Sequence, residues 1–292
     1  MREICVSAVQ MSVPETRELS IEKAERLTRE AAAKGANIVL LPELFETKYF
    51  CQERRYEYYE LASAVEDNPA VRRFCEVTRE LGLVMPISFY ERDINVFYNS
   101  VAVIDSGEVL GVYRKTHIPD DHFYQEKFYF TPGNTGFKVW KTRCGATIGV
   151  GICWDQWFPE TARCMALMGA EILFYPTAIG AEPILDVDSM PHWRRCMQGH
   201  AAANATPVVA ANRVGAERVI PCEENSNQSS ELKFYGSSFI TDVTGEVIES
   251  ADRESDRVIL HRFDLDEVRR ARDTWGLFSD RRPYMYGIIT DR

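Results

Sequence analysis

The sequence predicts an α/β protein, and three observations carry this prediction. A buried strand, an amphipathic helix and a second buried strand follow one another at the start of the chain, and the same order returns in its middle. The connections between helix and strand in the two units also have similar sequences, GANIVLLP at 35–42 and GAEILFYP at 169–176. Such connections are common, so the match agrees either with chance or with a two-fold pseudo-repeat. A repeat would give two layers of similar sheet, each covered by helices, within a single domain over 1–292.

The first unit is read from its pattern of apolar residues. Residues 3–11 (EICVSAVQM) are rich in β-branched side chains and predict a buried strand. Residues 18–34 predict a helix, followed by Gly35 where a C′ glycine belongs, and residues 37–42 predict the next strand. One face of the helix carries the apolar residues Ile21, Ala24, Leu27, Ala31 and Ala32. Two strands joined by a helix are expected to be parallel.

The second unit begins with an apolar strand at 146–152 that ends at Cys153. Pro159 suits the first turn of a helix because its missing N–H has no partner there, and this helix is expected to stop at Gly169. Residues 171–176 predict the following strand. Further strands are expected at 84–90, 97–105, 108–113, 207–212, 235–241, 246–249 and 257–263, with helices at about 191–204 and 264–272 and a polar surface loop at 222–231.

Composition excludes several classes of protein. The chain has 292 residues, with 34 Lys and Arg against 44 Asp and Glu, and this acidic balance argues against a nucleic-acid partner. Its eight cysteines form no C-x-x-C pair, so neither a zinc site nor a disulfide framework is expected. No apolar run approaches the 18 residues that a membrane helix needs. We therefore expect a cytoplasmic protein with reduced thiols, without a zinc site, a disulfide framework or a membrane span.

Three residues of complementary chemistry follow apolar runs, at the strand ends where open α/β sheets bind ligands. They are Glu43 after NIVLLP, Lys115 after VLGVYR and Cys153 after ATIGVGI. Each alone has an incidental explanation, because strand ends often carry charge and cysteine is often an inert core residue. Together they supply a nucleophile, a base and a cation for an oxyanion. The turn before the helix at Pro159 also offers Cys153 free backbone N–H groups.

These motifs resemble the nitrilase superfamily of carbon–nitrogen hydrolases. The resemblance rests on LLPELF (40–45), YRKTHIP (113–119) and GICWDQWFPE (151–160) and covers nearly the whole chain. Within the superfamily, further segments look most like N-carbamoylputrescine amidases. They are YQEKFYFTPG (124–133), YPTAIGAEP (175–183), HWRRCMQGHAAAN (192–204) and YGSSFI (235–240).

The resemblance implies a four-layer α-β-β-α sandwich with two pseudo-symmetric mixed sheets, a homo-oligomer built from dimers, and no cofactor. It implies a triad in which Cys153 attacks the carbonyl carbon and Glu43 takes the thiol proton and later activates water. Lys115 and the backbone N–H of Trp154 would hold the oxyanion. Glu126, before the F-x-P-G turn, matches a second family glutamate that orients Lys115 and the substrate amide. Its alternative is a solvated loop acid.

The expected reaction is hydrolysis of the small molecule N-carbamoylputrescine to putrescine, carbon dioxide and ammonia. Relatives that act on N-carbamoyl-D-amino acids have two arginines after the cysteine, where this chain has Gln156 and Trp157. The nearby charges are negative, from Asp155, Glu182 and Asp186. Glu182 is the candidate for binding the distal ammonium, with an exposed loop acid as its alternative. Four aromatic residues are candidates for lining the pocket for the four-carbon chain, and packing in the core is an equal alternative for each. They are Tyr49, Phe130, Trp154 and Trp193.

Three alternatives stay open at this point. The first is another amidase of the superfamily, such as an omega-amidase or an N-carbamoyl-β-alanine amidohydrolase. The second is a non-catalytic interaction module on the same fold, which would be expected to have lost part of the triad. The third is a nucleotide-binding doubly wound domain, which the absence of a G-x-G-x-x-G or P-loop glycine run disfavours.

Overall fold

Two mixed sheets of six strands form the middle of the computed structural model, which describes residues 2–181 and 187–291. The first sheet has the order β14-β1-β2-β3-β4-β5, with β1 Glu3–Gln10, β2 Ile38–Leu40, β3 Val84–Asp93, β4 Val96–Asp105, β5 Glu108–Arg114 and β14 Arg257–Asp264. The second has the order β13-β12-β9-β8-β7-β6, with β6 Val139–Lys141, β7 Thr147–Val150, β8 Ile172–Thr177, β9 Val208–Asn212, β12 Phe239–Thr241 and β13 Val247–Ser250. In each sheet three central strands are parallel, and antiparallel strands flank them.

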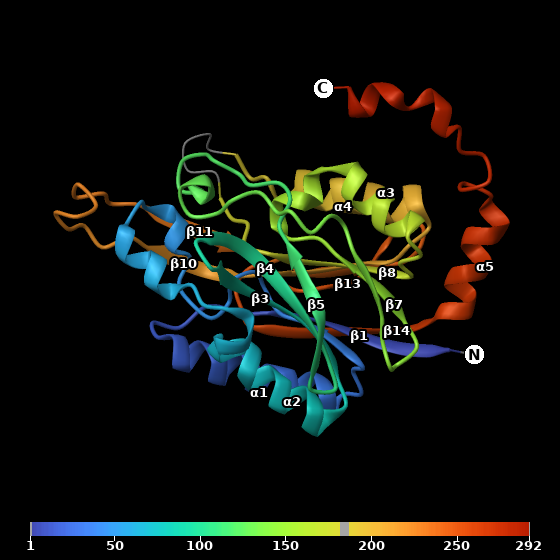
Figure 1. The fold of residues 1–292 in the computed structure, drawn as a ribbon. Helices are drawn as coiled ribbons and strands as arrows, with labels where there is room; N and C mark the ends of the chain where they lie inside the picture. The colour runs from blue at the N-terminus through green and yellow to red at the C-terminus, as the bar shows by residue number, and fades with distance from the viewer. Residues whose placement is uncertain (1, 182–186, 292) are drawn as a thin grey trace.

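Helices cover the outer face of each sheet, which gives four layers (Figure 1). The α-helices are α1 Arg17–Ala33 and α2 Pro69–Leu81 on the first sheet, α3 Pro159–Leu167 and α4 Met190–Asn204 on the second, and α5 Leu265–Trp275 after β14. Short 3-10 helices lie at Phe50–Gln52, Tyr56–Leu61, Val65–Asp67, Glu126–Phe128, Cys153–Trp157, Pro283–Met285 and Gly287–Thr290. The predicted α-β-β-α sandwich is confirmed.

The alternation of side chains along the central strands explains why they are apolar throughout. In and just after β2, Ile38 and Leu40 pack between the two sheets, whereas Val39 and Leu41 pack against the helices of the first sheet. Strand β8 alternates in the same way between the second sheet's helices and the core between the sheets. A strand buried on both faces therefore needs a continuous apolar run, which is the pattern that the sequence shows.

The helix termini follow local capping rules. Helix α1 begins at Arg17 because the Thr16 hydroxyl accepts a hydrogen bond from the N–H of Leu19 at 3.3 Å. Gly35, with a φ of +93°, and Gly169, with a φ of +98°, turn the chain from helix into strand in the two units. The two segments that match in sequence therefore occupy equivalent positions, since each connects a helix to the next parallel strand, one leading into β2 and the other into β8.

The structure corrects the sequence-based assignment around residues 235–241. This segment was expected to be one strand, but β11 (Glu231–Tyr235) ends before β12 starts. Gly236 and Ser237 both have a positive φ, and they turn the chain from the hairpin of β10 (Val214–Arg218) and β11 into the second sheet. Helix α2, strand β6 and strand β10 were not predicted. The polar loop expected at 222–231 lies at the tip of the hairpin.

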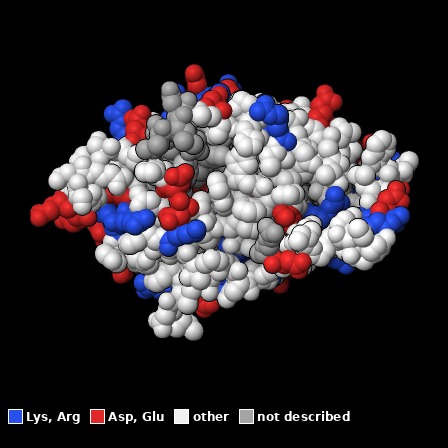
Figure 2. All heavy atoms as spheres, turned by 90° about the horizontal axis from the view of Figure 1, so that it is seen from above, with Lys and Arg blue, Asp and Glu red and all other residues white. Residues whose placement is uncertain are grey.

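The surface that lies over α3 and α4 carries charges of both signs. Acidic and basic side chains are interspersed on this face rather than gathered by sign (Figure 2). None of the helices in the described residues is long and apolar enough to cross a membrane.

Candidate active site

The three predicted triad residues come together between the sheets. Glu43 follows β2, Lys115 follows β5 directly, and Cys153 follows β7 by three residues. The Nζ of Lys115 lies 2.8 Å from Oε1 of Glu43. Both charged side chains influence the Cys153 thiol electrostatically. The structure therefore assembles an acid, a cation and a thiol that are up to 110 residues apart in the chain.

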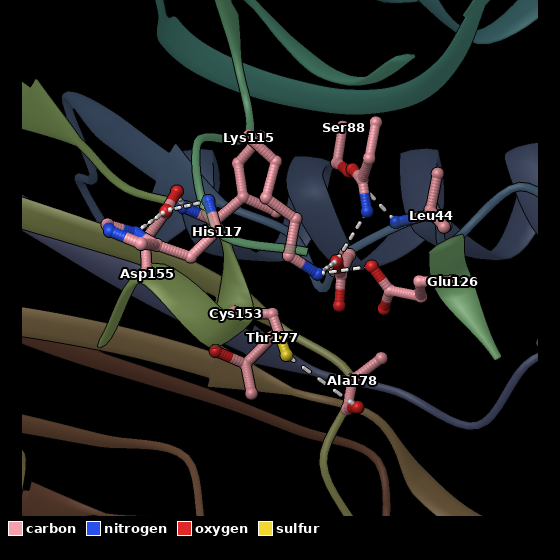
Figure 3. A network of polar contacts seen from close by, with 12 residues as sticks. Leu44, Ser88, Lys115, His117, Glu126, Cys153, Asp155, Thr177 and Ala178 are labelled. Carbon is pink, nitrogen blue, oxygen red and sulfur yellow. Dashed lines mark hydrogen bonds and ion pairs between the residues drawn. The ribbon is translucent and has the colours of Figure 1, made fainter. Parts of the chain in front are cut away.

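Lys115 lies between two carboxylates and is completely buried. Its Nζ donates to Oε1 of Glu43 at 2.8 Å and to Oε2 of Glu126 at 2.6 Å (Figure 3). Burial alone would lower the pKa of Lys115, but the charges of Glu126 and Glu43 outweigh it and raise the pKa well above its ordinary value. The side chain is thus a charged ammonium at neutral pH, at the centre of the site.

Glu126 begins a 3-10 helix and is also buried. Its Oε1 accepts a hydrogen bond from the Tyr49 hydroxyl at 2.7 Å, and its Oε2 accepts from Lys115. Burial, opposed by Lys115 and reinforced by the charge of Glu43, raises the pKa of Glu126 to about 7. The loop that carries Glu126 is therefore not solvated, and the alternative of an exposed loop acid is excluded.

Cys153 occupies a sharp turn with a φ of +41°, unusual for a residue with a side chain. Just before the turn, Gly151 lets the backbone pack against the ring of Tyr175, from which a Cβ at this position would lie only 2.8 Å. The 3-10 helix Cys153–Trp157 presents its first N–H groups, including that of Trp154, without carbonyl partners inside the helix. Burial and the neighbouring Glu43 raise the pKa of the Cys153 thiol well above its ordinary value. A base is therefore required to form the thiolate.

The carboxylate of Glu43 is held by one oxygen and free at the other. Its Oε1 accepts from Nδ2 of Asn99 at 2.7 Å as well as from Lys115. Its Oε2 is buried and has no hydrogen-bond partner in the described part of the chain. Leaving a buried carboxylate oxygen without a donor costs stability. The Cys153 thiol itself donates to the carbonyl of Ala178, with Sγ 3.8 Å from that oxygen (Figure 3).

A second buried carboxylate, Asp155, joins the Lys115 loop to the Cys153 turn. Its Oδ1 accepts from the backbone N–H of His117 at 3.0 Å and lies 2.7 Å from Nδ1 of His117. Its Oδ2 accepts from the Tyr113 hydroxyl at 2.8 Å and from the N–H of Ile152 at 3.0 Å. Figure 3 shows Asp155 and His117 facing one another beside Lys115 and Cys153.

The geometry agrees with what comparison with known proteins finds. A family model described as carbon-nitrogen hydrolase matches residues 5–273. The chain belongs to this family. A carbon–nitrogen hydrolase from Helicobacter pylori G27 has a similar structure, with a TM-score of 0.89, 34% identity and 99% of each chain covered.

Two curated relatives of this carbon–nitrogen hydrolase are similar over nearly their whole length. The N-carbamoylputrescine amidase of Oryza sativa subsp. japonica is 52% identical over 98% of this chain and 94% of its own. The citrullinase of Francisella tularensis subsp. tularensis is 50% identical over 99% of each chain.

The residues predicted to bind substrate lie in different surroundings. Tyr49 is buried and contacts Glu126, and Phe130 is buried in an aromatic cluster with Phe50 and Tyr90. Trp154 is 39% exposed. Glu182 lies outside the described residues, as does Asp186. Trp193, on the buried face of α4, is completely buried against Tyr235 and Phe239.

Asp155 was counted from the sequence among the negative charges near the nucleophile, and the structure gives it a different place. Its carboxylate is completely buried, and protein donors occupy both oxygens. It therefore has no oxygen to offer a cationic substrate tail. Its charge fixes the hydrolase's own loops instead.

Sequence reasoning missed Asn99 and gave no role to His117. Asn99 lies in the middle of an apolar strand, where one polar residue flanked by Tyr98 and Ser100 carries little signal. His117 lies two residues after Lys115, and its ring stacks on Phe158 with centroids 3.6 Å apart. Among the described residues, no group of three or more His, Cys, Asp or Glu side chains is arranged to hold a metal ion.

Proposed function

We propose that this carbon–nitrogen hydrolase converts N-carbamoylputrescine and water to putrescine, carbon dioxide and ammonia. The observation that carries the bond type is the buried cluster of Glu43, Lys115 and Glu126 around the Cys153 thiol. The substrate is supported by the similarity to curated N-carbamoylputrescine amidases, which are 52% and 51% identical in Oryza sativa subsp. japonica and Arabidopsis thaliana.

In the first half of the reaction, Oε2 of Glu43 takes the proton from Sγ of Cys153. The thiolate forms a bond to the ureido carbon, and the carbonyl oxygen becomes an oxyanion. Lys115 and the N–H of Trp154 stabilise this charge, a contribution worth a factor of about 10² to 10³ for each donor. Protonated Glu43 then gives its proton to the terminal nitrogen. The bond from carbon to that nitrogen breaks, releasing ammonia and leaving a carbamoyl thioester on Cys153.

In the second half, Glu43 takes a proton from water as the water oxygen attacks the thioester carbon. The bond from carbon to sulfur breaks, and the proton returns from Glu43 to the thiolate. The product is the carbamic acid of putrescine, which loses carbon dioxide to give the free amine. Glu126 keeps Lys115 in place and accepts from the Tyr49 hydroxyl throughout.

A second candidate substrate is citrulline, because the citrullinase relative is 50% identical over the whole chain. Citrulline has the same ureido group but carries a carboxylate at its distal end. Ammonia release should be measured side by side from N-carbamoylputrescine, citrulline and N-carbamoyl-β-alanine. We expect the highest kcat/KM with N-carbamoylputrescine. A higher value with either carboxylate substrate would refute this assignment and leave the bond type standing.

The nucleophile is tested separately from the substrate. Cys153→Ser and Cys153→Ala should fold normally and lose nearly all turnover, whereas Cys75→Ser on the outer helix α2 should keep it. Mass spectrometry of rapidly quenched wild-type enzyme should find a carbamoyl adduct on Cys153. An adduct on another cysteine, or undiminished turnover in Cys153→Ala, would refute this role.

For Glu182 we keep the proposed role of binding the distal ammonium. Glu182→Gln should raise KM for N-carbamoylputrescine at least tenfold, because the neutral amide no longer balances the cation, with a smaller effect on kcat. An unchanged KM would remove Glu182 from the substrate site.

We also propose that residues 1–292 form one catalytic domain. Calorimetry should then show a single unfolding transition.

We further propose a homo-oligomer built from dimers. It is supported by the apolar side chains that the C-terminal segment exposes, namely Tyr284, Met285, Ile288 and Ile289. Light scattering should then give a multiple of the 33.4 kDa chain mass, and the mass of one chain would contradict it. All eight cysteines are free, which fits the cytoplasmic location that cell fractionation should find.

A further inference from the structure

Arg213 is a completely buried arginine that the mechanism above does not use. It follows β9 directly, and its backbone is fixed on two sides. Its carbonyl accepts from the N–H of Gly236 at 3.0 Å, and it forms an isolated bridge with Met11 after β1. Burying a guanidinium is strongly unfavourable unless its N–H donors have acceptors, so the partners of Arg213 indicate its role.

The guanidinium bonds mainly to the turn that carries Glu43. Its Nε and Nη2 donate to the carbonyl of Glu43 at 3.1 and 3.0 Å, and Nη2 also donates to the carbonyl of Leu44 at 2.5 Å. Its Nη1 donates to the carbonyl of Thr47 at 3.1 Å and to Oε1 of Glu217 at 3.0 Å. These five contacts match the five N–H bonds that an arginine has. Four of the five hold the backbone of one turn.

That turn needs support because its backbone is strained. Leu44 has a φ of +47°, a conformation that side chains disfavour. Other contacts also hold the turn. The N–H of Leu44 donates to the Ser88 hydroxyl at 3.0 Å, the N–H of Glu43 donates to the Thr177 carbonyl at 3.3 Å, and the N–H of Thr47 donates to the Leu44 carbonyl at 3.3 Å. Arg213 satisfies the carbonyls on the other side. The guanidinium therefore helps to fix the backbone from which the Glu43 side chain projects.

The same guanidinium reaches the second carboxylate of the site through Glu217. The Oε2 of Glu217 accepts from the backbone N–H of Tyr49 at 2.6 Å, while its Oε1 accepts from Arg213. The guanidinium carbon lies 5.6 Å from the centre of the Tyr49 ring. Tyr49 in turn donates its hydroxyl to Glu126. The buried ion pair of Arg213 and Glu217 thus contacts the segments that position Glu43 and Glu126, the two acids that bind Lys115.

We propose that Arg213, with Glu217, is a positioning residue that aims the Glu43 carboxylate at the thiol and steadies the Tyr49–Glu126 contact. This inference rests on the proposed function in that Glu43 is the base. Lysine cannot replace Arg213, because an ammonium has three donors at one point, whereas the four carbonyl contacts need a planar fork. A misplacement of the reacting groups by about 1 Å costs about a hundredfold in rate.

The test compares Arg213→Lys with Arg272→Lys as a matched control. Arg272 lies on α5 and also donates to two oxygens, those of the Ala170 carbonyl and the Thr206 hydroxyl. Neither oxygen belongs to the turn that carries Glu43. Both variants should fold, as circular dichroism and thermal unfolding will show. Arg213→Lys should lower kcat about a hundredfold with KM changed less than threefold, whereas Arg272→Lys should keep the wild-type kcat.

A substrate-independent readout separates this inference from the proposed substrate. The rate at which iodoacetamide alkylates Cys153 reports thiolate formation by Glu43 and needs no knowledge of the substrate. Arg213→Lys should slow this rate about a hundredfold in the wild-type background and less than twofold in a Glu43→Gln background, because there is no longer a base to aim. If N-carbamoylputrescine is not turned over at all, the proposed substrate fails while the alkylation cycle still tests Arg213.

Equal slowing in both backgrounds would show a general structural role and overturn the inference, as would a folded Arg213→Lys with wild-type alkylation. If Arg213→Lys does not fold, Glu217→Gln takes its place in the same cycle. The neutral amide weakens one charge-assisted contact to Arg213 and one to Tyr49. It should slow alkylation about tenfold, again only where Glu43 is present, and no slowing would count against the proposal.

Discussion

The ammonium of Lys115 lies 2.8 Å from Oε1 of Glu43, and solvent reaches neither side chain. Glu126 completes the cluster at 2.6 Å from the same ammonium. The cluster therefore contains one cation and two buried acids, so it carries a net negative charge whenever Glu43 and Glu126 are both ionised. This imbalance next to the thiol determines how the site responds to mutation and to pH.

Lys115→Met should lose both stability and activity. The variant leaves two carboxylates buried without their cation, and breaking a buried pair in this way costs about 3–5 kcal/mol. Turnover should fall at least a thousandfold because the oxyanion also loses its charged donor. Urea denaturation and ammonia release measure the two effects. Lys138→Met is the control and should leave turnover unchanged, since the Lys138 ammonium donates to the Val112 carbonyl and to no other group in the described residues. A Lys115→Met variant as stable as the wild type would contradict the burial argument.

Glu126→Gln should change how stability depends on pH. The pKa of Glu126 is raised from 4.5 to about 7 in the folded state, mainly by burial, so the folded protein holds this proton more tightly than the unfolded chain does. Ionising Glu126 therefore costs stability as pH rises from about 4.5 to about 7. The unfolding free energy of the wild type minus that of Glu126→Gln should fall across this window and level off above it. Denaturation curves at pH 4.5 to 8 measure the difference, and a difference that rises with pH would contradict the shifted pKa.

Much of this site was predictable because its main residues stand at strand ends. Glu43, Lys115 and Cys153 each close an apolar run, so the topology of the sheets alone brings them near one another. Asn99 and Arg213 were not predictable in this way. Each is one polar residue within or beside an apolar strand, and only the three-dimensional pairing shows that its donors point at Glu43.

The secondary structure was likewise predictable where local sequence signals determine it and harder to predict where tertiary contacts do. The two repeated connections at Gly35 and Gly169 were predictable because helix ends have local signals. The break after Tyr235 has a local signal, Gly236 followed by Ser237 and Ser238, which the sequence-based assignment did not use. It depends on the chain leaving the hairpin for the second sheet, which is a tertiary effect. Helix α2 carried readable signals, an Asn68 cap followed by Pro69, that the sequence-based assignment did not use.

Asn99→Asp should abolish most activity without unfolding the protein. Asn99 links two members of the proposed triad, because its Nδ2 donates to Glu43 at 2.7 Å and its backbone carbonyl accepts from the N–H of Lys115 at 2.8 Å. Aspartate keeps the shape but replaces the donor by a second negative charge beside Glu43. We expect kcat to fall about a hundredfold at neutral pH.

Asn68→Asp is the matched control for this change. Asn68 is also buried and donates to a glutamate, Glu46, at 3.0 Å, and aspartate would still cap helix α2 through its carboxylate oxygen. Asn68→Asp should lose stability to a similar degree while keeping kcat within threefold of the wild type. An equal loss of kcat in the two variants would show that burying an extra charge, rather than the Asn99–Glu43 contact, is responsible.

Asp155→Asn should separate catalysis from substrate binding. The carboxylate accepts four hydrogen bonds or close contacts, from Tyr113, Ile152 and the backbone and ring of His117, and an amide nitrogen cannot accept those on its side. Unsatisfied buried donors cost about 1–3 kcal/mol of stability. The Lys115 loop and the Cys153 turn then lose their common anchor, so kcat should fall ten- to a hundredfold while KM changes little. Tyr113→Phe removes one of these contacts and should give a smaller loss in the same direction. Steady-state kinetics of the two variants measure this order, and a rise in KM at constant kcat would instead assign Asp155 to substrate binding.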